Sequence, residues 1–343
     1  MGLSSGAMRA YVFVCLVACG NSPHDAGTVD APGFAGHHDG AANGDSALLD
    51  APASAKRSIF IIPMENEPSS AIYGNTMYAP YINSLMSQAA YATKFQDELP
   101  ALVSEPHYIW MEAGTNQFND ITFTTDANPT GSHSTSSGEH LTTQLDTAHI
   151  TWMSYQQGIA ANTCPISSVS STNVVYAPKH DPMVFFQDIA GNPPSSSNAL
   201  CVAHHKPYAA FQADLLAGNV AQYVFITPDL CHDMHGDSAC TQGTGANANI
   251  KAGDDWLKAE LPRILDYANA HDGVVLLVWD EGDSSNLVPF LALGPRIKPG
   301  PSGTTYSHSS QLKSVEEILG VPVLPTVASA NDFADIFQSG MFP

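Results

Sequence analysis

The sequence has little charge, and very little of that charge is positive. Asp, Glu, Lys and Arg make up 13% of its 343 residues, and 33 acidic residues outnumber 12 basic ones, for a formal net charge of −21. A protein that binds nucleic acid needs a basic surface, so this balance excludes nucleic acid as a partner. It does not exclude a small phosphate ester, because a metal ion can hold such a ligand in a locally positive pocket.

The apolar segment near the N-terminus is too short to cross a membrane. It is the run AYVFVCLVA after Arg9, about half the length of a spanning helix. A lone Arg, a short apolar run and small residues before Cys19 are typical of a signal peptide, and LVAC at 16–19 resembles a bacterial lipobox. We therefore expect residues 1–19 to be a signal peptide and Cys19 to carry a lipid. This predicts an exported bacterial protein, anchored in the cell envelope on the periplasmic or outer surface. An ordinary signal peptide with an incidental cysteine is the alternative.

Residues 20–55 lack the composition of a folded segment. They are rich in Gly, Ala, Asp and Pro and cannot bury a core, so we expect a disordered tether whose histidines are solvated. Residues 56–343 remain as one folded domain, and an apolar content of 44% supports a substantial core. The sequence does not specify an oligomeric state.

Cysteine is scarce outside the N-terminal segment. Four cysteines remain after residue 19: Cys164, Cys201, Cys231 and Cys240. An even number in an exported chain predicts two disulfides, and four cysteines allow three pairings. We expect Cys231 to pair with Cys240, because this closes a short loop, which leaves Cys164 with Cys201.

Apolar segments typical of strands alternate with segments of helical periodicity. Strands are expected at 58–64, 150–156, 220–228, 274–282 and 289–295. Helices are expected at 79–90, 140–149, 206–218, 253–273 and 309–320, with a short helix or turn at 107–114. This alternation predicts an α/β fold, a three-layer α/β/α sandwich with a mostly parallel central sheet.

Two of the expected strands end on pairs of oxygen-bearing side chains. Glu65 and Asn66 follow the first, and Asp280 and Glu281 follow the most apolar one. Ends of neighbouring parallel strands converge on one edge of a sheet, so these four residues should share a crevice. Their carboxylates would repel one another by several kcal/mol at low dielectric. One divalent cation would resolve the repulsion, and an all-oxygen set favours Ca²⁺, Mg²⁺ or Mn²⁺. The alternative is that one pair is a helix cap or part of a salt bridge.

Three histidines in turns between these elements are candidates for acid–base chemistry near neutral pH. They are His107 in SEPHYIW, His180 in YAPKHDP and His235 in PDLCHDMHGDS. His308 in YSHSS ranks below them.

The motifs occur in the order found in a known family. IFIIPMENEPSSAIYG, SEPHYIWMEAGTN, YAPKHDPMVFF, FITPDLCHDMHGD and VVLLVWDEGD, together with the segments between them, resemble the phosphoesterase family of the alkaline-phosphatase superfamily. That family contains bacterial phospholipases C, acid phosphatases and plant non-specific phospholipases C. The resemblance implies an alkaline-phosphatase-like fold, a metal and phosphate cluster at Glu65, Asn66, Asp280 and Glu281, and phosphate-binding and proton-transfer roles for His107, His180 and His235.

The position of the nucleophile departs from the family pattern. The family has Thr or Ser at the start of the helix before a block that here is LDTAHITW, and an ungapped count back from Trp152 places His140 there. Imidazole can attack phosphorus, so His140 is the expected nucleophile. Thr142, Thr143, a metal-activated water and an inactive site are the alternatives.

The expected function is therefore a metal-dependent phosphoesterase that hydrolyses phosphate mono- or diesters outside the cytoplasm. Its substrate would be a small phosphate ester or a phospholipid. The rival interpretation is a non-catalytic surface lipoprotein that keeps the fold as a ligand-binding module.

Overall fold

The computed structural model describes residues 57–243 and 245–343. The expected signal peptide at 1–19, the lipid anchor at Cys19 and the tether at 20–55 lie outside these residues and stay predictions. In the described part of the chain, no helix is both long and apolar enough to cross a bilayer.

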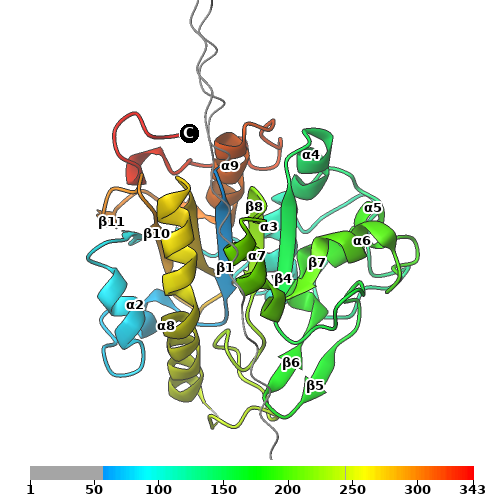
Figure 1. Cartoon of the computed structure of the whole chain (residues 1–343), viewed down its shortest axis with the longest axis horizontal. Coiled ribbons are helices and arrows are strands. Elements are labelled where there is room, and N and C mark those ends of the chain that lie inside the picture. Colours follow the sequence, from blue (N-terminus) through cyan, green and yellow to red (C-terminus); the bar gives the residue numbers. More distant parts are fainter. Residues whose placement is uncertain (1–56, 244) are drawn as a thin grey trace, which may run out of the picture. The chain divides into compact units, whose positions relative to one another are not determined.

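An eight-stranded sheet forms the centre of the domain (Figure 1). Its strands, in spatial order, are β11 (Gly300–Ser302), β2 (Ala90–Ala92), β10 (Phe290–Leu293), β9 (Val274–Trp279), β1 (Ile59–Met64), β8 (Tyr223–Thr227), β4 (Trp152–Gln156) and β7 (His205–Pro207). Every neighbouring pair is parallel except the two that involve β10, which is antiparallel to β9 and to β2. The predicted mostly parallel sheet is confirmed.

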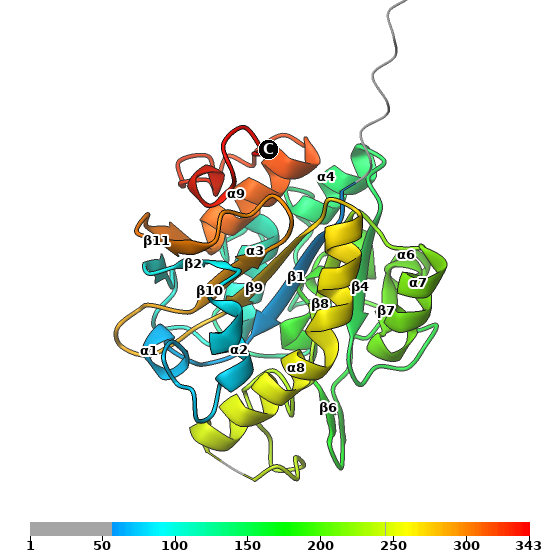
Figure 2. The same ribbon diagram turned by 60° about the vertical axis from the view of Figure 1, so that its left-hand side comes forward.

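Helices cover both faces of this sheet (Figures 1 and 2). One layer contains α8, which packs against α2, and the other contains α3, which packs against α9. The α-helices are α1 (Ser69–Ile72), α2 (Pro80–Leu85), α3 (Ser104–Ala113), α4 (Leu141–Thr147), α5 (Gln187–Ala190), α6 (Ala199–His204), α7 (Phe211–Ala217), α8 (Ala246–Ala270) and α9 (His308–Leu319). The 3-10 helices are η1 (Pro178–His180), η2 (Pro182–Phe185), η3 (Tyr208–Ala210) and η4 (Ala334–Ile336).

Short strand pairs complete the fold outside the main sheet. They are β12 (Tyr306–Ser307) with β3 (Phe95–Gln96), and the hairpin of β5 (Val169–Ser171) with β6 (Val174–Tyr176).

Two expected helices were too long. The segment 79–90 is helical only to Leu85, and Ala90 already begins β2, because the sheet recruits this apolar end as a strand beside β10. The segment 206–218 begins as the end of edge strand β7, and only Phe211–Ala217 is α-helical. Tertiary pairing has overridden local helical periodicity in both places.

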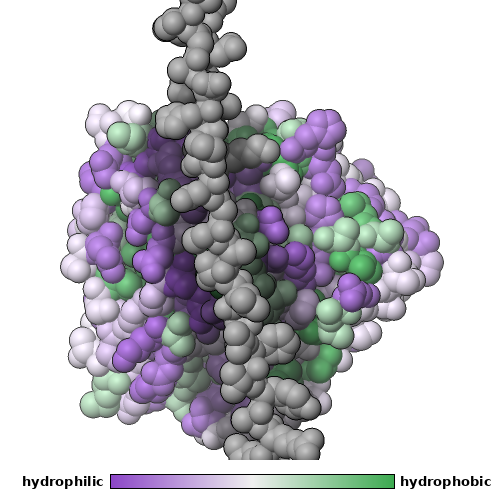
Figure 3. Space-filling view, viewed as in Figure 1, coloured by the Kyte–Doolittle hydropathy of each residue, from purple (hydrophilic) through white to green (hydrophobic). Residues whose placement is uncertain are grey.

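The core lies around β1 and β9, whose twelve residues are all buried. Phe60 of β1 contacts Phe211 of α7 and Tyr267 of α8 edge-on, so the helices on that side close over the strand. On the face viewed in Figure 3, hydrophilic residues are interspersed with small hydrophobic patches, as expected of helices whose apolar sides face the sheet. This rigid centre positions the residues that follow β1, β8 and β9.

Candidate active site

The strand-end residues Glu65 and Asp280 lie side by side. They follow β1 and β9, which pair in parallel with Met64 opposite Trp279. The backbone N–H of Asn66 donates to Asp280 Oδ1 at 3.0 Å, and Asn66 turns the chain with φ of 59°. Both carboxylates are fully buried. The structure therefore brings together the two acidic pairs that the sequence places 215 positions apart.

The loop after β8 contributes a third buried carboxylate. Asp233 lies between Cys231 and Cys240, which form a disulfide, and the backbone N–H of Glu65 donates to the carbonyl of Asp233 at 2.8 Å. The second disulfide joins Cys164 and Cys201, so the predicted pairing is confirmed.

His180 stands between two of these carboxylates without hydrogen bonding to either. Its Nε2 is 3.2 Å from Glu65 Oε1 and its Nδ1 is 3.3 Å from Asp233 Oδ2. The ring is buried and stacks on Tyr108 of α3 at 4.9 Å. Among the described residues, neither ring nitrogen has a hydrogen-bond partner, and Glu65 Oε1, Asp233 Oδ2 and Asp280 Oδ2 have none either. Buried polar atoms are normally paired, so this group of unpaired ligand atoms needs an account.

A divalent cation fits these atoms. Ligand atoms of Glu65, His180 and Asp233 lie within 4.8 Å of one another. Burial raises the pKa of Asp233 well above its usual range, and the nearby charge of Glu65 raises it further. Burial followed by the charges of Glu65 and Glu281 does the same to the pKa of Asp280. Burial also lowers the pKa of His180 well below its usual range, which leaves a neutral imidazole with a lone pair to donate. A bound cation would offset the repulsion among the carboxylates.

His107 is close to the cluster but is poorly suited to be a ligand. Ligand atoms of His107, Asp280 and Glu281 also lie within 4.8 Å of one another. However, its Nδ1 donates to the carbonyl of Val103 at 2.8 Å, and its Nε2 donates to Asp97 Oδ1 at 2.8 Å. Burial alone would lower the pKa of His107, but the hydrogen bond and charge of Asp97 outweigh it and raise the pKa. His107 therefore supplies a buried positive charge beside the carboxylates.

Ser104 projects into the cluster from the first position of α3. Its hydroxyl lies 3.1 Å from Glu65 Oε2 and 3.2 Å from Glu281 Oε1, and it accepts a hydrogen bond from Lys179 Nζ at 3.3 Å. The helix begins here because Val103 is extended and because Pro106, in the first turn, lacks an N–H that a helix start would leave unpaired anyway. A buried hydroxyl in contact with two carboxylates and an ammonium group is placed to act as a nucleophile.

Lys179, which borders the same hydroxyl, also contacts His235. Lys179 Nζ is 3.2 Å from His235 Nε2 and 2.8 Å from Asp126 Oδ2. His235 Nδ1 donates to the carbonyl of Gly236, so Nε2 is its acceptor for the Lys179 proton. Burial would lower the pKa of Lys179, but the charges of Glu65 and Asp126 raise it above its usual value. His308 is buried beside His107, with the ring centroids 6.1 Å apart, and donates from Nε2 to the carbonyl of Trp279.

His140 does not contact the group around Ser104 and Glu65. Its Nδ1 contacts Glu112 Oε1 at 2.9 Å, and its Nε2 contacts Asp188 Oδ1 at 3.1 Å. Glu112 stands eight residues after Ser104 on α3, which is about 12 Å along a helix. The structure thus separates His140 from the residues that it was expected to join, and Thr142 and Thr143 stay with His140 at this far end.

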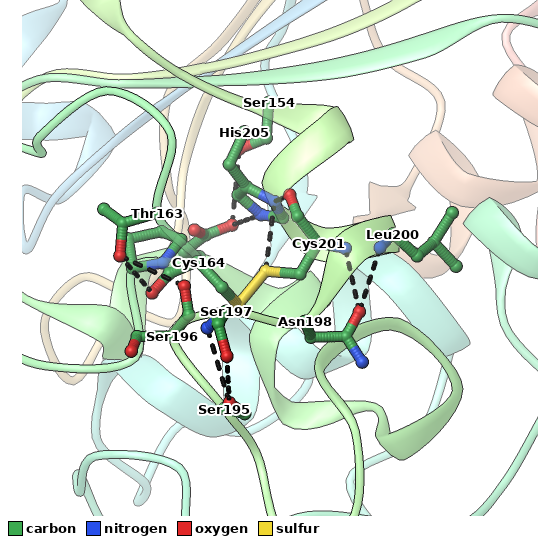
Figure 4. Close-up of a disulfide and its surroundings, with 12 residues drawn as sticks. Ser154, Thr163, Cys164, Ser195, Ser196, Ser197, Asn198, Leu200, Cys201 and His205 are labelled. Carbon is green, nitrogen blue, oxygen red and sulfur yellow. Dashed lines mark hydrogen bonds and ion pairs between the residues drawn. A yellow bond between two sulfur atoms is a disulfide. The ribbon is translucent and has the colours of Figure 1, made fainter.

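A buried polar network supports His180 from behind. Asp181, the next residue, lies 3.2 Å from His205 Nε2 and accepts from Ser154 and Tyr176. His205 Nδ1 donates to the carbonyl of Cys201, so the Cys164–Cys201 disulfide lies directly against this histidine (Figure 4). The network fixes the turn that carries Lys179 and His180.

Three residues of this site were not among the sequence predictions: Ser104, Lys179 and Asp233. The proline at position 106 was a usable signal for Ser104, because it marks the start of a helix three residues earlier than the one expected at 107. Lys179 is next to a predicted site histidine, and Asp233 lies between His232 and His235. No spacing in the sequence indicates that Asp233 turns back toward β1.

Comparison with known proteins agrees with this geometry. A family model, the Phosphoesterase family, matches residues 75–322. A phosphatidylinositol-3-phosphatase of Mycobacterium tuberculosis is 28% identical over 81% of this chain and 82% of its own length. A phosphate-repressible acid phosphatase of Penicillium chrysogenum is 29% identical over 52% of this chain, a match that spans only 42% of the fungal enzyme.

Solved structures show the fold. The lipoteichoic acid synthase LtaP of Listeria monocytogenes superposes with a TM-score of 0.52 at 12% identity, over 81% of this chain and 77% of its own. A protein in the alkaline phosphatase superfamily from Vibrio parahaemolyticus has a TM-score of 0.51 at 11% identity, over 79% and 68%. The expected alkaline-phosphatase-like fold is confirmed. With the family match covering most of the chain, this protein belongs to the phosphoesterase family, whose reaction class is the hydrolysis of phosphoric esters.

Proposed function

We propose that this protein is a metal-dependent phosphatase in which Ser104 attacks phosphorus. The observation that carries the proposal is the position of the Ser104 hydroxyl, within 3.3 Å of Glu65, Glu281 and Lys179 and next to unpaired ligand atoms. The relatives named as phosphatases support the reaction class. We assign the nucleophile to Ser104 in preference to His140, because both ring nitrogens of His140 are already engaged.

Glu65, His180 and Asp233 would hold the cation, with Asp280 beside them. When bound, it would neutralise the buried carboxylates and polarise the phosphate oxygens as a Lewis acid. The carboxylate oxygens suit Mn²⁺, Mg²⁺ or Ca²⁺, whereas an imidazole ligand suits a transition metal, so Mn²⁺ fits this mixed set best of the three.

The chain's own residues supply nucleophile and proton transfer. Glu281 accepts the proton of the Ser104 hydroxyl, and Lys179 stabilises the oxygen that is left. The serine oxygen bonds to phosphorus as the ester bond breaks, and the departing alcohol takes up the proton. Water then cleaves the phosphoserine, releasing inorganic phosphate and restoring the hydroxyl.

Acid quenching during turnover of p-nitrophenyl phosphate tests this assignment. We expect a phosphoserine at Ser104, stable in acid and labile in base, and we expect Ser104→Ala to abolish turnover. Ser309→Ala is the matched control, because Ser309 is also a buried serine in a first helical turn that donates to a glutamate, Glu98. A phosphohistidine at position 140, recovered from a parallel base quench because it is labile in acid and stable in base, would instead place the chemistry on His140.

The rival function, ligand binding without catalysis, makes a different prediction. It predicts that phosphate mono- and diesters are not hydrolysed at any pH or with any added metal ion. The clustered buried carboxylates argue against it, since a scaffold has no need of uncompensated charge.

Export and lipid anchoring at Cys19 are part of the proposal. Two disulfides support an oxidising compartment. Cys19→Ser should release the protein from the membrane fraction of the cells that make it, whereas retention there would argue against the anchor.

A further inference from the structure

Lys179 is held against the nucleophile by a closed ring of contacts. Its ammonium group donates to Asp126 Oδ2, and Asp126 Oδ1 accepts the backbone N–H of Glu105 at 3.0 Å. Glu105 follows Ser104 in the chain, and Ser104 accepts from Lys179. The position of the ammonium group is therefore fixed relative to the attacking oxygen.

Lys179 borders a hollow at the protein surface. The side chain is only 12% exposed, yet a hollow of about 320 Å³ opens beside it, lined also by Asp126, Asn128 and Ser168. Lys179 is the basic residue in the lining of this hollow. Because Nζ is within 3.3 Å of Ser104 Oγ, a phosphoryl group that approaches Oγ from the side of Lys179 brings a non-bridging oxygen within reach of Nζ.

The number of free oxygens distinguishes the two ester classes. A phosphate monoester dianion has three non-bridging oxygens that share two negative charges. A diester has two such oxygens and one charge, and its third position carries a carbon substituent. A fixed ammonium group gains more from the extra charged oxygen than from an ester oxygen.

We propose that Lys179 makes this site selective for phosphate monoester dianions over diesters, by pairing with the third non-bridging oxygen. This inference rests on the proposed function and narrows its substrate class. Asp126 acts on it as a positioning residue.

Two substrates with the same leaving group test the selectivity. They are p-nitrophenyl phosphate and methyl p-nitrophenyl phosphate, which differ by one methyl group and one charge. We expect Lys179→Met to lower kcat/KM for the monoester by roughly 100-fold and for the diester by only a few-fold. Lys179→Arg, which keeps the charge, should retain more of the monoester preference than Lys179→Met. Lys206→Met is the matched control, because Lys206 pairs with Asp214 on a different part of the sheet and should leave the ratio unchanged.

An equal loss for both substrates, or no change in their ratio, would overturn the inference. If Lys179→Met does not fold, Asp126→Asn decides in the same way, because it frees the ammonium group: a fall in the monoester preference supports the role and an unchanged preference contradicts it.

Titration calorimetry with inorganic phosphate separates this inference from the proposed function. If the wild type turns over neither ester, the proposed function fails, and Lys179→Met must still weaken phosphate binding at least about tenfold.

Discussion

Two clusters, each with a buried histidine between two carboxylates, lie near the two ends of helix α3. The near cluster is His180 with Glu65 and Asp233, and the far cluster is His140 with Glu112 and Asp188. The hydrogen bonding of the two histidines differs. At the far end, His140 is bonded at both ring nitrogens, to Glu112 at 2.9 Å and to Asp188 at 3.1 Å. At the near end, His180 has carboxylate oxygens at 3.2 and 3.3 Å and bonds to neither. In the far cluster one buried oxygen, Glu112 Oε2, lacks a partner, whereas in the near cluster both ring nitrogens and one oxygen of each carboxylate lack one among the described residues. Residue type alone does not distinguish a structural cluster from a site; the unpaired atoms do.

The charges of the two clusters explain the difference. Burial alone would lower the pKa of His140, but the bonds to Asp188 and Glu112 raise it to about 9, so the histidine is a cation within its own ion pairs. Burial and Lys179 instead lower the pKa of His180, so its neighbours Glu65 and Asp233 have no cationic partner in the imidazole. In the near cluster Lys179 and His107 offset only part of the charge of Glu65, Asp233, Asp280 and Glu281, so a bound cation would add stabilisation there that the far cluster does not need.

The largest expected effect is on the near cluster. Glu65→Gln and Asp280→Asn each remove a carboxylate that the site uses, and we expect turnover of p-nitrophenyl phosphate to fall by roughly 100- to 1,000-fold or more. Elemental analysis of the purified variants should show less bound metal than the wild type. Glu112→Gln is the control at the far end and should keep its metal. Full metal occupancy in both near-end variants would refute the assignment of the site.

Loss of the far histidine should affect stability instead. His140→Ala leaves Glu112 buried without its partner, and breaking a buried ion pair costs about 3–5 kcal/mol. Urea unfolding should show this loss, while the folded variant keeps turnover within a few-fold of the wild type. A folded but inactive His140→Ala protein would mean that His140 takes part in catalysis.

The far cluster should also make stability depend on pH. The folded-state pKa of His140 is raised to about 9 from the ordinary histidine value of 6.5. A raised pKa contributes stability that is fully present below the unfolded value and is lost as the pH rises through the folded one. This contribution, about 3 kcal/mol, should therefore disappear between pH 6.5 and 9. Unfolding free energies of wild type and His140→Gln, measured across this range, should converge as the pH rises; a constant difference between them would contradict the charged state of His140.

The contrast between the clusters shows what the sequence can and cannot predict. Glu65 and Asp280 were predictable because each ends an apolar strand, and parallel strands bring their ends together whatever the loops do. His140 was assigned as the nucleophile from its position along the sequence alone. That position does not indicate which end of α3 the residue contacts. Ser104 gains its neighbours from the docking of α3 against η1, which is a tertiary contact. Asp233 depends likewise on the path of a disulfide-closed loop.

That loop leads to the smallest expected effect. Cys231 and Cys240 close nine positions of chain around Asp233 and His235. Asp233 accepts the N–H of Glu65 at its carbonyl and the N–H of His235 at Oδ1, and its Oδ2 has no donor among the described residues, so the covalent loop that carries His235 helps to restrict where the carboxylate points. Replacing both cysteines with serine should widen that range and weaken metal binding by about tenfold, the usual size of an outer-shell effect. Calorimetric titration with Mn²⁺ measures it, and His232→Ala is the control, since His232 lies in the same loop but bonds outward to Asp229. Unchanged Mn²⁺ affinity in the double variant would mean that β1, through Glu65, positions Asp233 without help from the disulfide.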